Sequence, residues 1–377
     1  MKHVLTLSKK STSVTKNYIN FVANVMSAHC AIRGFAAHAM PRYALAVTHL
    51  FPLTLKRVQG WNCSAEAKLN LHIQLAPHHP KGLLLSNPVM VAAGTFGYGT
   101  EYADFIDIQR LGAIICKGTT LMPRKGNPQP RLVETASGLL NSVGLENIGV
   151  EALVREKAPI WANWQVPVIV NVAGEVVEEY VGVAQRLEGV PGISGIEINI
   201  SCPNISAGGM EFGISPKLAA EVTSAVKNIS SLPLIIKLSP NVTDIKEIAL
   251  AVEEAGANAI SLINTVKGMA IDIDKRKPCL GNITGGLSGP AIKPLALYMV
   301  YEVAKVVHVP VIGCGGIASS RDALEFIMCG AGAVQIGTAN LTNPQISLTI
   351  LEGIENFMRE KGTQDLTYLV GIAQGKS

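Results

Sequence analysis

A cysteine stands between two side-chain amides at the end of an apolar run, in the segment Asn199-Ile200-Ser201-Cys202-Pro203-Asn204. A buried strand has little use for this combination, because each amide needs hydrogen-bond partners. A thiol with a pKa near ~8.5 serves as a nucleophile or as a general base toward a carbon acid. No histidine lies in the strand-end motifs described below that would activate Cys202 as a nucleophile. Base catalysis by Cys202 is therefore the favoured chemistry.

Further asparagines follow other apolar runs or lie in a long connection. Amides donate and accept hydrogen bonds without carrying charge, so together they suit a ligand ring whose edge alternates N–H and C=O groups, as a pyrimidine does. Any one of these asparagines alone could instead cap a turn. The set is Asn141, Asn171, Asn199, Asn204 and Asn264.

Two lysines and two glycine pairs also stand at the ends of apolar runs. Lys117 and Lys237 are costly to bury unpaired, and a lysine extending to solvent at the rim explains either one alone. The segments 314–317, "CGGI", and 336–339, "IGTA", each precede a helical pattern. Glycines there let backbone N–H groups face an anion, although a plain tight turn is the alternative. Two such pairs on the last two strands, with both lysines, favour a phosphate-bearing or otherwise anionic ligand.

These residues are positioned by eight short, β-branched runs that alternate with amphipathic helical stretches. Near-continuous apolar strands separated by helices indicate a parallel sheet covered on both faces. Eight units predict an α/β fold, the (β/α)8 TIM barrel, in which the strand ends meet at one mouth. An open doubly wound sheet is the competitor, but "AGTFGYG" after the first run lacks its glycine spacing. The runs cover 88–93, 112–117, 167–172, 195–200, 233–238, 258–263, 310–315 and 332–337, and the clearest helical stretches 174–189, 215–230 and 244–257.

Two connections, 118–145 and 264–289, exceed ordinary loop length. Long insertions in a compact domain are usually functional loops. We expect both to lie over the mouth of the barrel.

The formal net charge of +4 is too small to indicate a nucleic-acid partner, and the N-terminus concentrates it. No Asp or Glu precedes Glu66, whereas lysines and arginines recur from Lys2 onward. Residues 1–66 thus form a basic extension before a catalytic domain at 67–377. It is typical of a targeting peptide, and a translation start downstream, near Leu69, explains it at least as well. Its apolar runs fall short of the ~18–20 residues of a membrane span.

Seven cysteines form no C-x-x-C pair, which argues against a zinc or iron–sulfur site in this chain. Their odd number, without a secretory signal, fits a reducing compartment and hence a cytoplasmic location. Cys116, Cys314 and Cys329 are expected to be inert buried fillers.

In combination the motifs resemble class 1 dihydroorotate dehydrogenases, the FMN-dependent barrel enzymes of pyrimidine synthesis. The resemblance covers roughly 69–377, and "GGLSGPAIKP" with "AGTFGYG" is most similar to the NAD-linked type 1B catalytic subunit. The motifs, in family order, are "NPVMVAAGTFGYG", "GAIICKGTT", "NSVGLEN", "EINISCPN", "IIKLSPN", "GGLSGPAIKP", "GCGGI" and "VQIGTA".

The resemblance implies roles for individual residues. Cys202 would remove a proton from C5 of dihydroorotate while hydride passes from C6 to flavin N5, and Lys237 would stabilise the reduced ring near N1 and O2. Ala93 replaces a serine common in the family, so only a backbone contact to the flavin is expected there. Substrate would be held by Lys117, Asn141, Val143, Gly144, Leu145, Asn199, Asn204, Asn264 and Thr265. Flavin would be held by Ala93, Lys117, Gly118, Asn171, Asn199, Lys237, Ile263, Gly289, Gly315, Gly316, Gly337 and Thr338, the last four around its phosphate.

The resemblance also implies a partner. Type 1B enzymes pass electrons to a separate subunit that carries FAD and a [2Fe–2S] cluster and reduces NAD, so a homodimer or a heterotetramer with that subunit is expected.

Several alternatives differ from this interpretation in single features. Class 2 enzymes use serine as the base, which disfavours that class here. Dihydropyrimidine dehydrogenases carry histidine where this chain has Asn204. The fumarate-linked type 1A enzymes differ only in their acceptor and stay the nearest alternative. Outside the family, the alternatives are a flavin-free phosphate-binding barrel, an isomerase or synthase, and a non-catalytic binding subunit.

Overall fold

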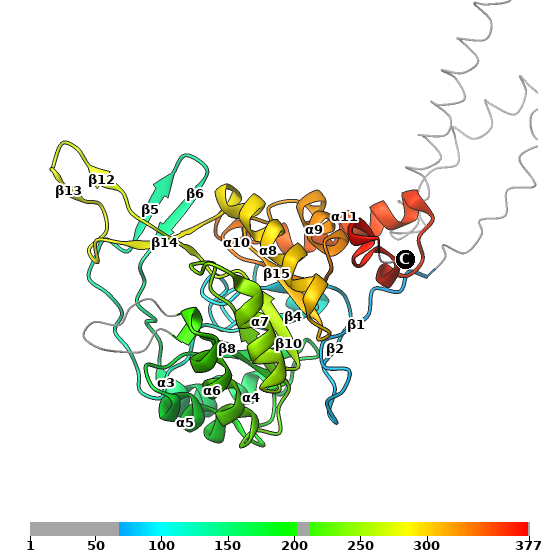
Figure 1. The fold of residues 1–377 in the computed structure, drawn as a ribbon, viewed down its shortest axis with the longest axis horizontal. Helices are drawn as coiled ribbons and strands as arrows, with labels where there is room; N and C mark the ends of the chain where they lie inside the picture. The colour runs from blue at the N-terminus through cyan, green and yellow to red at the C-terminus, as the bar shows by residue number, and fades with distance from the viewer. Residues whose placement is uncertain (1–67, 202–211, 376–377) are drawn as a thin grey trace, which may run out of the picture. The chain divides into compact units, whose positions relative to one another are not determined.

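Eight parallel strands close into a barrel in the computed structural model, which describes residues 68–201 and 212–375. The strand order is β10-β15-β16-β3-β4-β7-β8-β9 (Figure 1). Every apolar run singled out above supplies one strand, so the predicted (β/α)8 TIM barrel is confirmed. The strands are β3 (Val89–Val91), β4 (Ala113–Ile115), β7 (Val168–Val172), β8 (Gly195–Asn199), β9 (Leu234–Lys237), β10 (Ala259–Leu262), β15 (Val311–Cys314) and β16 (Ala331–Ile336).

Helices surround this barrel and bury one face each against it (Figure 1). The α5 helix buries Tyr180, Val183 and Leu187, which recur at the three- and four-residue spacing of a helix face. The α6 helix begins where the Ser215 hydroxyl accepts a hydrogen bond from the Leu218 amide, with Pro216 in the first turn. The helices are α3 (Gly149–Glu156), α4 (Ala158–Trp161), α5 (Val177–Leu187), α6 (Pro216–Lys227), α7 (Ile245–Glu254), α8 (Lys293–Val306), α9 (Ser320–Met328), α10 (Ala339–Thr342) and α11 (Ile346–Lys361).

The two long connections pair with each other in a second sheet. They follow β4 and β10, so this antiparallel sheet of order β11-β14-β6-β5 stands at the carboxyl ends of the barrel strands. We predicted loops here, and the strands are a finding of the structure. The strands outside the barrel are β5 (Leu132–Thr135), β6 (Gly138–Asn141), β11 (Val266–Gly268), β14 (Gly285–Ser288), the hairpin of β12 (Ile271–Asp272) and β13 (Lys277–Pro278), and the pair of β1 (Ile73–Gln74) and β2 (Leu84–Leu85).

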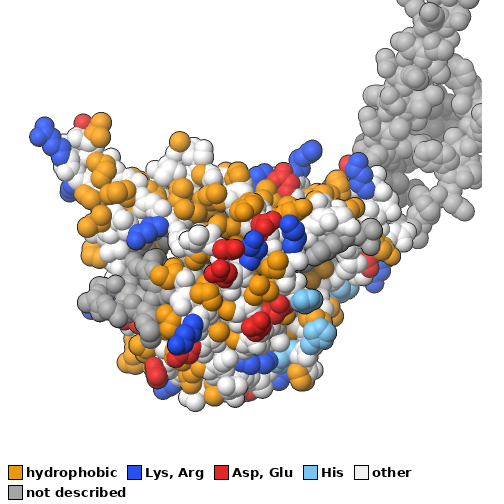
Figure 2. Space-filling view, viewed as in Figure 1, with side chains coloured by type: hydrophobic (Ala, Val, Ile, Leu, Met, Phe, Trp, Pro, Cys, Tyr) orange, Lys and Arg blue, Asp and Glu red, His pale blue; other side chains and the backbone are white. Residues whose placement is uncertain are grey.

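The β12–β13 hairpin projects from the barrel domain (Figure 1). Ile273 at its tip is 82% exposed, and Lys275, Arg276 and Lys277 follow it. Figure 2 shows apolar side chains along this projection and basic ones at its end. In the described part of the chain, no helix is both long and apolar enough to cross a membrane.

A buried and an exposed isoleucine should contribute differently to the stability of the fold. Ile169 on β7 is fully buried, so Ile169→Ala should lower the free energy of unfolding by about 2–5 kcal/mol, through lost burial and a residual cavity. Ile273→Ala deletes the same atoms at an exposed site and should change the free energy of unfolding by less than about 0.5 kcal/mol. Urea denaturation of both variants measures this. Equal losses in the two variants would contradict the described packing.

Candidate active site

A carboxylate buried inside the barrel is the centre of a polar network. Glu197 on β8 is 0% exposed. Its Oε1 accepts a hydrogen bond from Asn171 Nδ2 at 2.7 Å, and its Oε2 accepts from Ser261 Oγ at 2.8 Å and from Gln335 Nε2 at 2.6 Å. The donors come from three different strands, β7, β10 and β16. Three donors compensate for the hydration that the carboxylate loses on burial.

The network continues to Lys237, the last residue of β9. Its Nζ donates to Gln335 Oε1 at 2.5 Å and lies 3.7 Å from Cys314 Sγ. Lys237 is only 5% exposed, so it lies inside the barrel and does not extend to solvent at the rim. The alternative of a rim lysine is thereby excluded for Lys237.

The charge state of Lys237 follows from its neighbours. Burial lowers the pKa of its ammonium, but the interactions with Cys314 and Glu197 raise the pKa, and the net shift is upward. Burial also raises the pKa of the Cys314 thiol. At neutral pH Cys314 is therefore an uncharged thiol, so the interaction with Glu197 is the one that favours the charged form of Lys237.

Two of the predicted substrate amides are in direct contact at the ends of β8 and β10. Asn264 Nδ2 donates to Asn199 Oδ1 at 3.2 Å, and the Ser201 amide donates to the same oxygen at 3.1 Å. Tyr180 on α5 donates its hydroxyl to the Asn199 carbonyl at 3.0 Å. Asn264 Oδ1 in turn accepts from the Thr265 amide at 2.8 Å. Asn199, Asn264 and Thr265 therefore form one hydrogen-bonded group.

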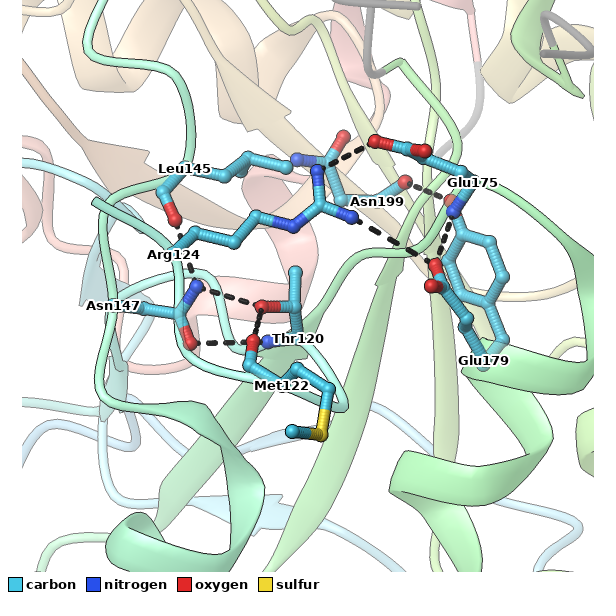
Figure 3. Close-up of polar contacts among 9 residues, drawn as sticks. Thr120, Met122, Arg124, Leu145, Asn147, Glu175, Glu179 and Asn199 are labelled. Atoms are coloured by element: carbon cyan, nitrogen blue, oxygen red, sulfur yellow. Dashed lines mark hydrogen bonds and ion pairs between the residues drawn. The ribbon is translucent and has the colours of Figure 1, made fainter. Parts of the chain in front are cut away.

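Asn147 fixes the segment that contains Val143, Gly144 and Leu145. It is 6% exposed, and its Nδ2 donates to Leu145 O at 2.7 Å and to Thr120 Oγ1 at 2.8 Å. Its Oδ1 accepts from the Thr120 amide at 3.2 Å and from the Gly149 amide at 2.8 Å. Figure 3 shows Asn147 between Thr120 and Leu145. One side chain thus ties the start of the first long connection to its end.

Arg124 extends from the same connection toward α5. Its guanidinium lies 2.7 Å from a Glu175 oxygen and 3.8 Å from a Glu179 oxygen (Figure 3). Arg124 and Lys117 both line a cavity of about 650 Å³. The other lining residues are Tyr98, Pro123, Lys125, Glu146, Asn147 and Ile148. Three of the lining side chains are cationic and one is anionic, which favours an anionic ligand beside Lys117.

Two of the four predicted phosphate residues, Gly315 and Gly316, pack against two other predicted flavin residues. Gly315 and Gly316 have φ values of +128° and +76°, which L side chains rarely adopt. A Cβ on Gly315 would lie 3.2 Å from Ile263 Cγ1, and one on Gly316 would lie 2.9 Å from the Gly289 carbonyl oxygen. These four residues are therefore packed against one another.

The neighbouring turn after β16 is open. A Cβ on Gly337 would meet only Ala92, at 3.7 Å, so its backbone can approach a ligand closely. Thr338 Oγ1 donates to Ser288 Oγ at 2.8 Å, which links this turn to β14. Gly94, next to the half-buried Ala93, would have nothing within 4 Å of an added Cβ. Open glycines on adjacent strands form a cradle that side chains would fill.

The remaining predicted flavin residues lie at the ends of β4 and β7. A Cβ on Gly118 would lie 3.2 Å from Asn171 Oδ1 and 3.3 Å from Leu145 Cδ2. Asn141 on β6 lies in the second sheet, where its Nδ2 donates to the Gly286 carbonyl at 3.1 Å. Open glycines at the ends of β3 and β16 leave room for a phosphate group, and the buried Lys237 ammonium suits the polar edge of a flavin ring, so the chemistry of these residues is compatible with FMN. The residues present therefore fit this cofactor.

Two predicted site residues, Cys202 and Asn204, lie outside the described residues. Glu197, Gln335 and Asn147 are not among the site residues that the motifs predict. Glu197 and Gln335 had a signal, because each interrupts an otherwise apolar strand, "GIEINI" and "GAVQIG". Asn147 lies in "NSVGLEN", where nothing in the pattern shows that its side chain binds the backbone on both sides.

The structure is a closed (β/α)8 barrel with a buried lysine at the end of β9 and open glycines at the ends of β3 and β16, where barrel enzymes place their active sites. Residues 78–358 match the family model described as dihydroorotate dehydrogenase. The chain belongs to the dihydroorotate dehydrogenase family.

Three similar proteins carry the name dihydroorotate dehydrogenase B (NAD(+)), catalytic subunit. The protein of that name from Desulforamulus reducens is 55% identical over 306 residues, which are 81% of this chain and 99% of the relative. The one from Geotalea uraniireducens is 54% identical over 77% of this chain and 95% of its own length. The one from Geotalea daltonii is 52% identical over 81% of this chain and 98% of its own length.

The cysteines differ in predicted reactivity. Burial raises the pKa of Cys116 from 9.0 to about 12, so at pH 9 only about one Cys116 in a thousand is the reactive thiolate. Iodoacetamide at about pH 9 should therefore label the half-buried Cys279 in the folded protein and spare Cys116 and Cys314. Peptide mapping measures the labelling, and all three should react in urea. Labelling of native Cys116 as fast as Cys279 would contradict the structure.

Loss of Asn147 should destabilise the protein and loosen the Val143–Leu145 segment. Asn147→Ala leaves the buried Thr120 and Gly149 amides without their acceptor, which should cost about 2–4 kcal/mol of unfolding free energy. Asn163→Ala removes an exposed asparagine that bonds only locally, to Pro159, and should cost less than about 0.5 kcal/mol. Urea denaturation measures the unfolding free energies of both variants. Similar losses in the two would show that the Asn147 hydrogen bonds do not stabilise this segment.

Proposed function

We propose that this chain catalyses the oxidation of (S)-dihydroorotate to orotate in pyrimidine (UMP) biosynthesis, as the catalytic subunit of an NAD-linked dihydroorotate dehydrogenase. The observation that carries this proposal is the 55% identity to a protein of that name over 99% of its length. The cationic cavity beside Lys117 supports it, because dihydroorotate carries a carboxylate. The buried Lys237 supports it as well, because a flavin ring gains negative charge on reduction. The catalytic domain is 67–377, and residues 1–66 are the extension; a cytoplasmic location follows from the resemblance to class 1 enzymes.

Dihydroorotate dehydrogenases are in general FMN flavoproteins, and we assign FMN to the barrel mouth of this chain. When bound, FMN accepts the hydride from C6 of dihydroorotate. Gly315, Gly316, Gly337 and Thr338 hold its phosphate. Around the ring and ribityl chain we place Ala93, Lys117, Gly118, Asn171, Asn199, Lys237, Ile263 and Gly289.

Cys202 acts as the base that removes the proton from C5 of the substrate. Ser201, the residue before it, is held from both sides: its amide donates to Asn199 Oδ1, and its hydroxyl donates to the Lys237 carbonyl at 3.3 Å. The chain thus enters the Cys202 segment from a fixed point between β8 and β9. A general base needs this kind of positioning to reach its proton.

The substrate is held by the amide group at the ends of β8 and β10 and by the Asn147-anchored segment. The paired Asn199 and Asn264 face a ring edge with alternating donors and acceptors. Lys117, in its cationic cavity, binds the substrate carboxylate. The full set is Lys117, Asn141, Val143, Gly144, Leu145, Asn199, Asn204, Asn264 and Thr265.

Replacement of the base tests the proposed chemistry. Cys202→Ala should keep bound flavin and slow its reduction by dihydroorotate ~10²–10⁴-fold, as expected for loss of a general base. Anaerobic stopped-flow absorbance measures this single turnover. Cys279→Ala, in the projecting connection, is the matched control and should keep the wild-type rate. Unchanged reduction in the Cys202 variant would remove this residue from the mechanism.

Electrons leave the chain through a partner. We infer a separate subunit with FAD and [2Fe–2S] that reduces NAD, with this chain as a homodimer or in a heterotetramer with that subunit. Seven cysteines without a C-x-x-C pair are in line with a cluster held elsewhere. Fumarate as direct acceptor, the type 1A reaction, is the second candidate.

An acceptor assay separates the two types. The complex purified with its partner should reduce NAD with dihydroorotate, and the chain alone should reduce neither NAD nor fumarate efficiently, because its flavin has no route to NAD. Orotate formation with each acceptor is the measurement. Rapid fumarate reduction by the lone chain would assign it to type 1A.

A further inference from the structure

The buried carboxylate of Glu197 determines how two neighbouring amides are oriented. A carboxylate only accepts hydrogen bonds, so Asn171 and Gln335 must each turn their NH₂ groups toward it. Their distances to Glu197 are 2.7 Å and 2.6 Å. The opposite end of each amide, its oxygen, must then face away from Glu197. Gln335 Oε1 faces the Lys237 ammonium, and Asn171 Oδ1 faces the side of Gly118.

We propose that Glu197 is a positioning residue for the flavin site: through Gln335 it holds the Lys237 ammonium in place and charged, and through Asn171 it presents an amide oxygen to the cofactor. The inference rests on the proposed function only in that a flavin binds at this mouth. Glu197 itself is fully buried among strands and acts through the residues that it orients.

The strand register explains why one residue can do this. Asn171 on β7 is the register partner of Glu197, and Lys237 on β9 is the partner of Ser261. Gln335 on β16 stands opposite Cys314 on β15. Because the barrel is closed, these inward side chains meet across its interior.

The charge on Lys237 depends on Glu197. The titratable groups that face Lys237 from the other strands, among the described residues, are Glu197 on β8 and Cys314 on β15. Cys314 is a buried thiol, uncharged at neutral pH because burial raises its pKa. A buried lysine without an anion loses its proton several pH units early. Without Glu197, Lys237 should therefore become neutral within the physiological pH range.

A neutral Lys237 would no longer stabilise the negative charge that the flavin ring gains on reduction. The midpoint potential of bound FMN should then show a step with pH that wild-type protein lacks, because reduction becomes less favourable once Lys237 is deprotonated. A purely structural carboxylate would change stability and leave the shape of this pH curve unaltered. The pH dependence of the midpoint potential therefore distinguishes a Glu197 that positions Lys237 from a Glu197 that only contributes to the packing of the barrel.

The test compares FMN-loaded wild-type protein, Glu197→Gln and Ser261→Ala by potentiometric titration between about pH 6 and 9. Across this pH range the midpoint potential of Glu197→Gln should change by at least ~30 mV more than that of wild type. For a two-electron couple this is a ~tenfold change in the ratio of reduced to oxidised flavin. Ser261→Ala removes a hydrogen bond to the same oxygen of Glu197 and leaves in place the hydrogen bonds that join Glu197 to the two amides and Gln335 to Lys237. The midpoint potential of Ser261→Ala should have the same pH dependence as that of wild type.

A second pair of variants covers failure of Glu197→Gln to fold, since an unpaired buried lysine is destabilising. Lys237→Met and Lys237→Met/Glu197→Gln leave no unpaired buried lysine. If Glu197 acts through Lys237, the double variant should show the same pH curve as Lys237→Met. A pH step in the double variant that Lys237→Met lacks would overturn the proposal.

Failure of this inference differs from failure of the proposed function. If wild-type protein binds no FMN, or its FMN is not reduced by dihydroorotate, the function is wrong. If wild type behaves as proposed but Glu197→Gln overlays it across the pH range, or Ser261→Ala shifts equally, Glu197 has no positioning role.

Discussion

A charge enclosed in an apolar barrel must be paired and hydrogen-bonded, and this constraint organises the structure around Glu197 and Lys237. Both side chains are buried, and Gln335 hydrogen-bonds to each of them and so joins them. The barrel must close for β8, β9 and β16 to present these groups to one another. The fold thus holds a buried lysine in a fixed position at the end of β9, and the proposed function uses it to stabilise a reduced flavin ring.

The second sheet completes the site from above the barrel ends. Segments that enter from β4 and β10 pair as β6 with β14, and the Asn141 side chain bonds across that pair. Asn147 anchors the chain just beyond β6 on Thr120 (Figure 3). Both connections are therefore held by hydrogen bonds to each other and to the barrel, which suits residues that must hold a substrate in one orientation.

The sequence predicted the barrel because its strands are near-continuous β-branched runs, a local signal that needs no tertiary information. It did not predict the second sheet, because segments such as "GGLS" have no apolar alternation and pair with residues far away in the chain. Lys237 and Asn171 were identified as strand-end residues, but their partners were not. The convergence of donors on Glu197 depends on strand register and barrel closure, which one-dimensional spacing does not contain.

The central claim is that this barrel passes hydride from dihydroorotate to a bound flavin. The most direct measurement mixes FMN-loaded wild-type protein with dihydroorotate in the absence of oxygen and follows flavin absorbance and orotate together. The account predicts loss of the oxidised-flavin absorbance, with orotate formed in an amount equal to the flavin reduced. Flavin that stays oxidised in the presence of saturating dihydroorotate would contradict it.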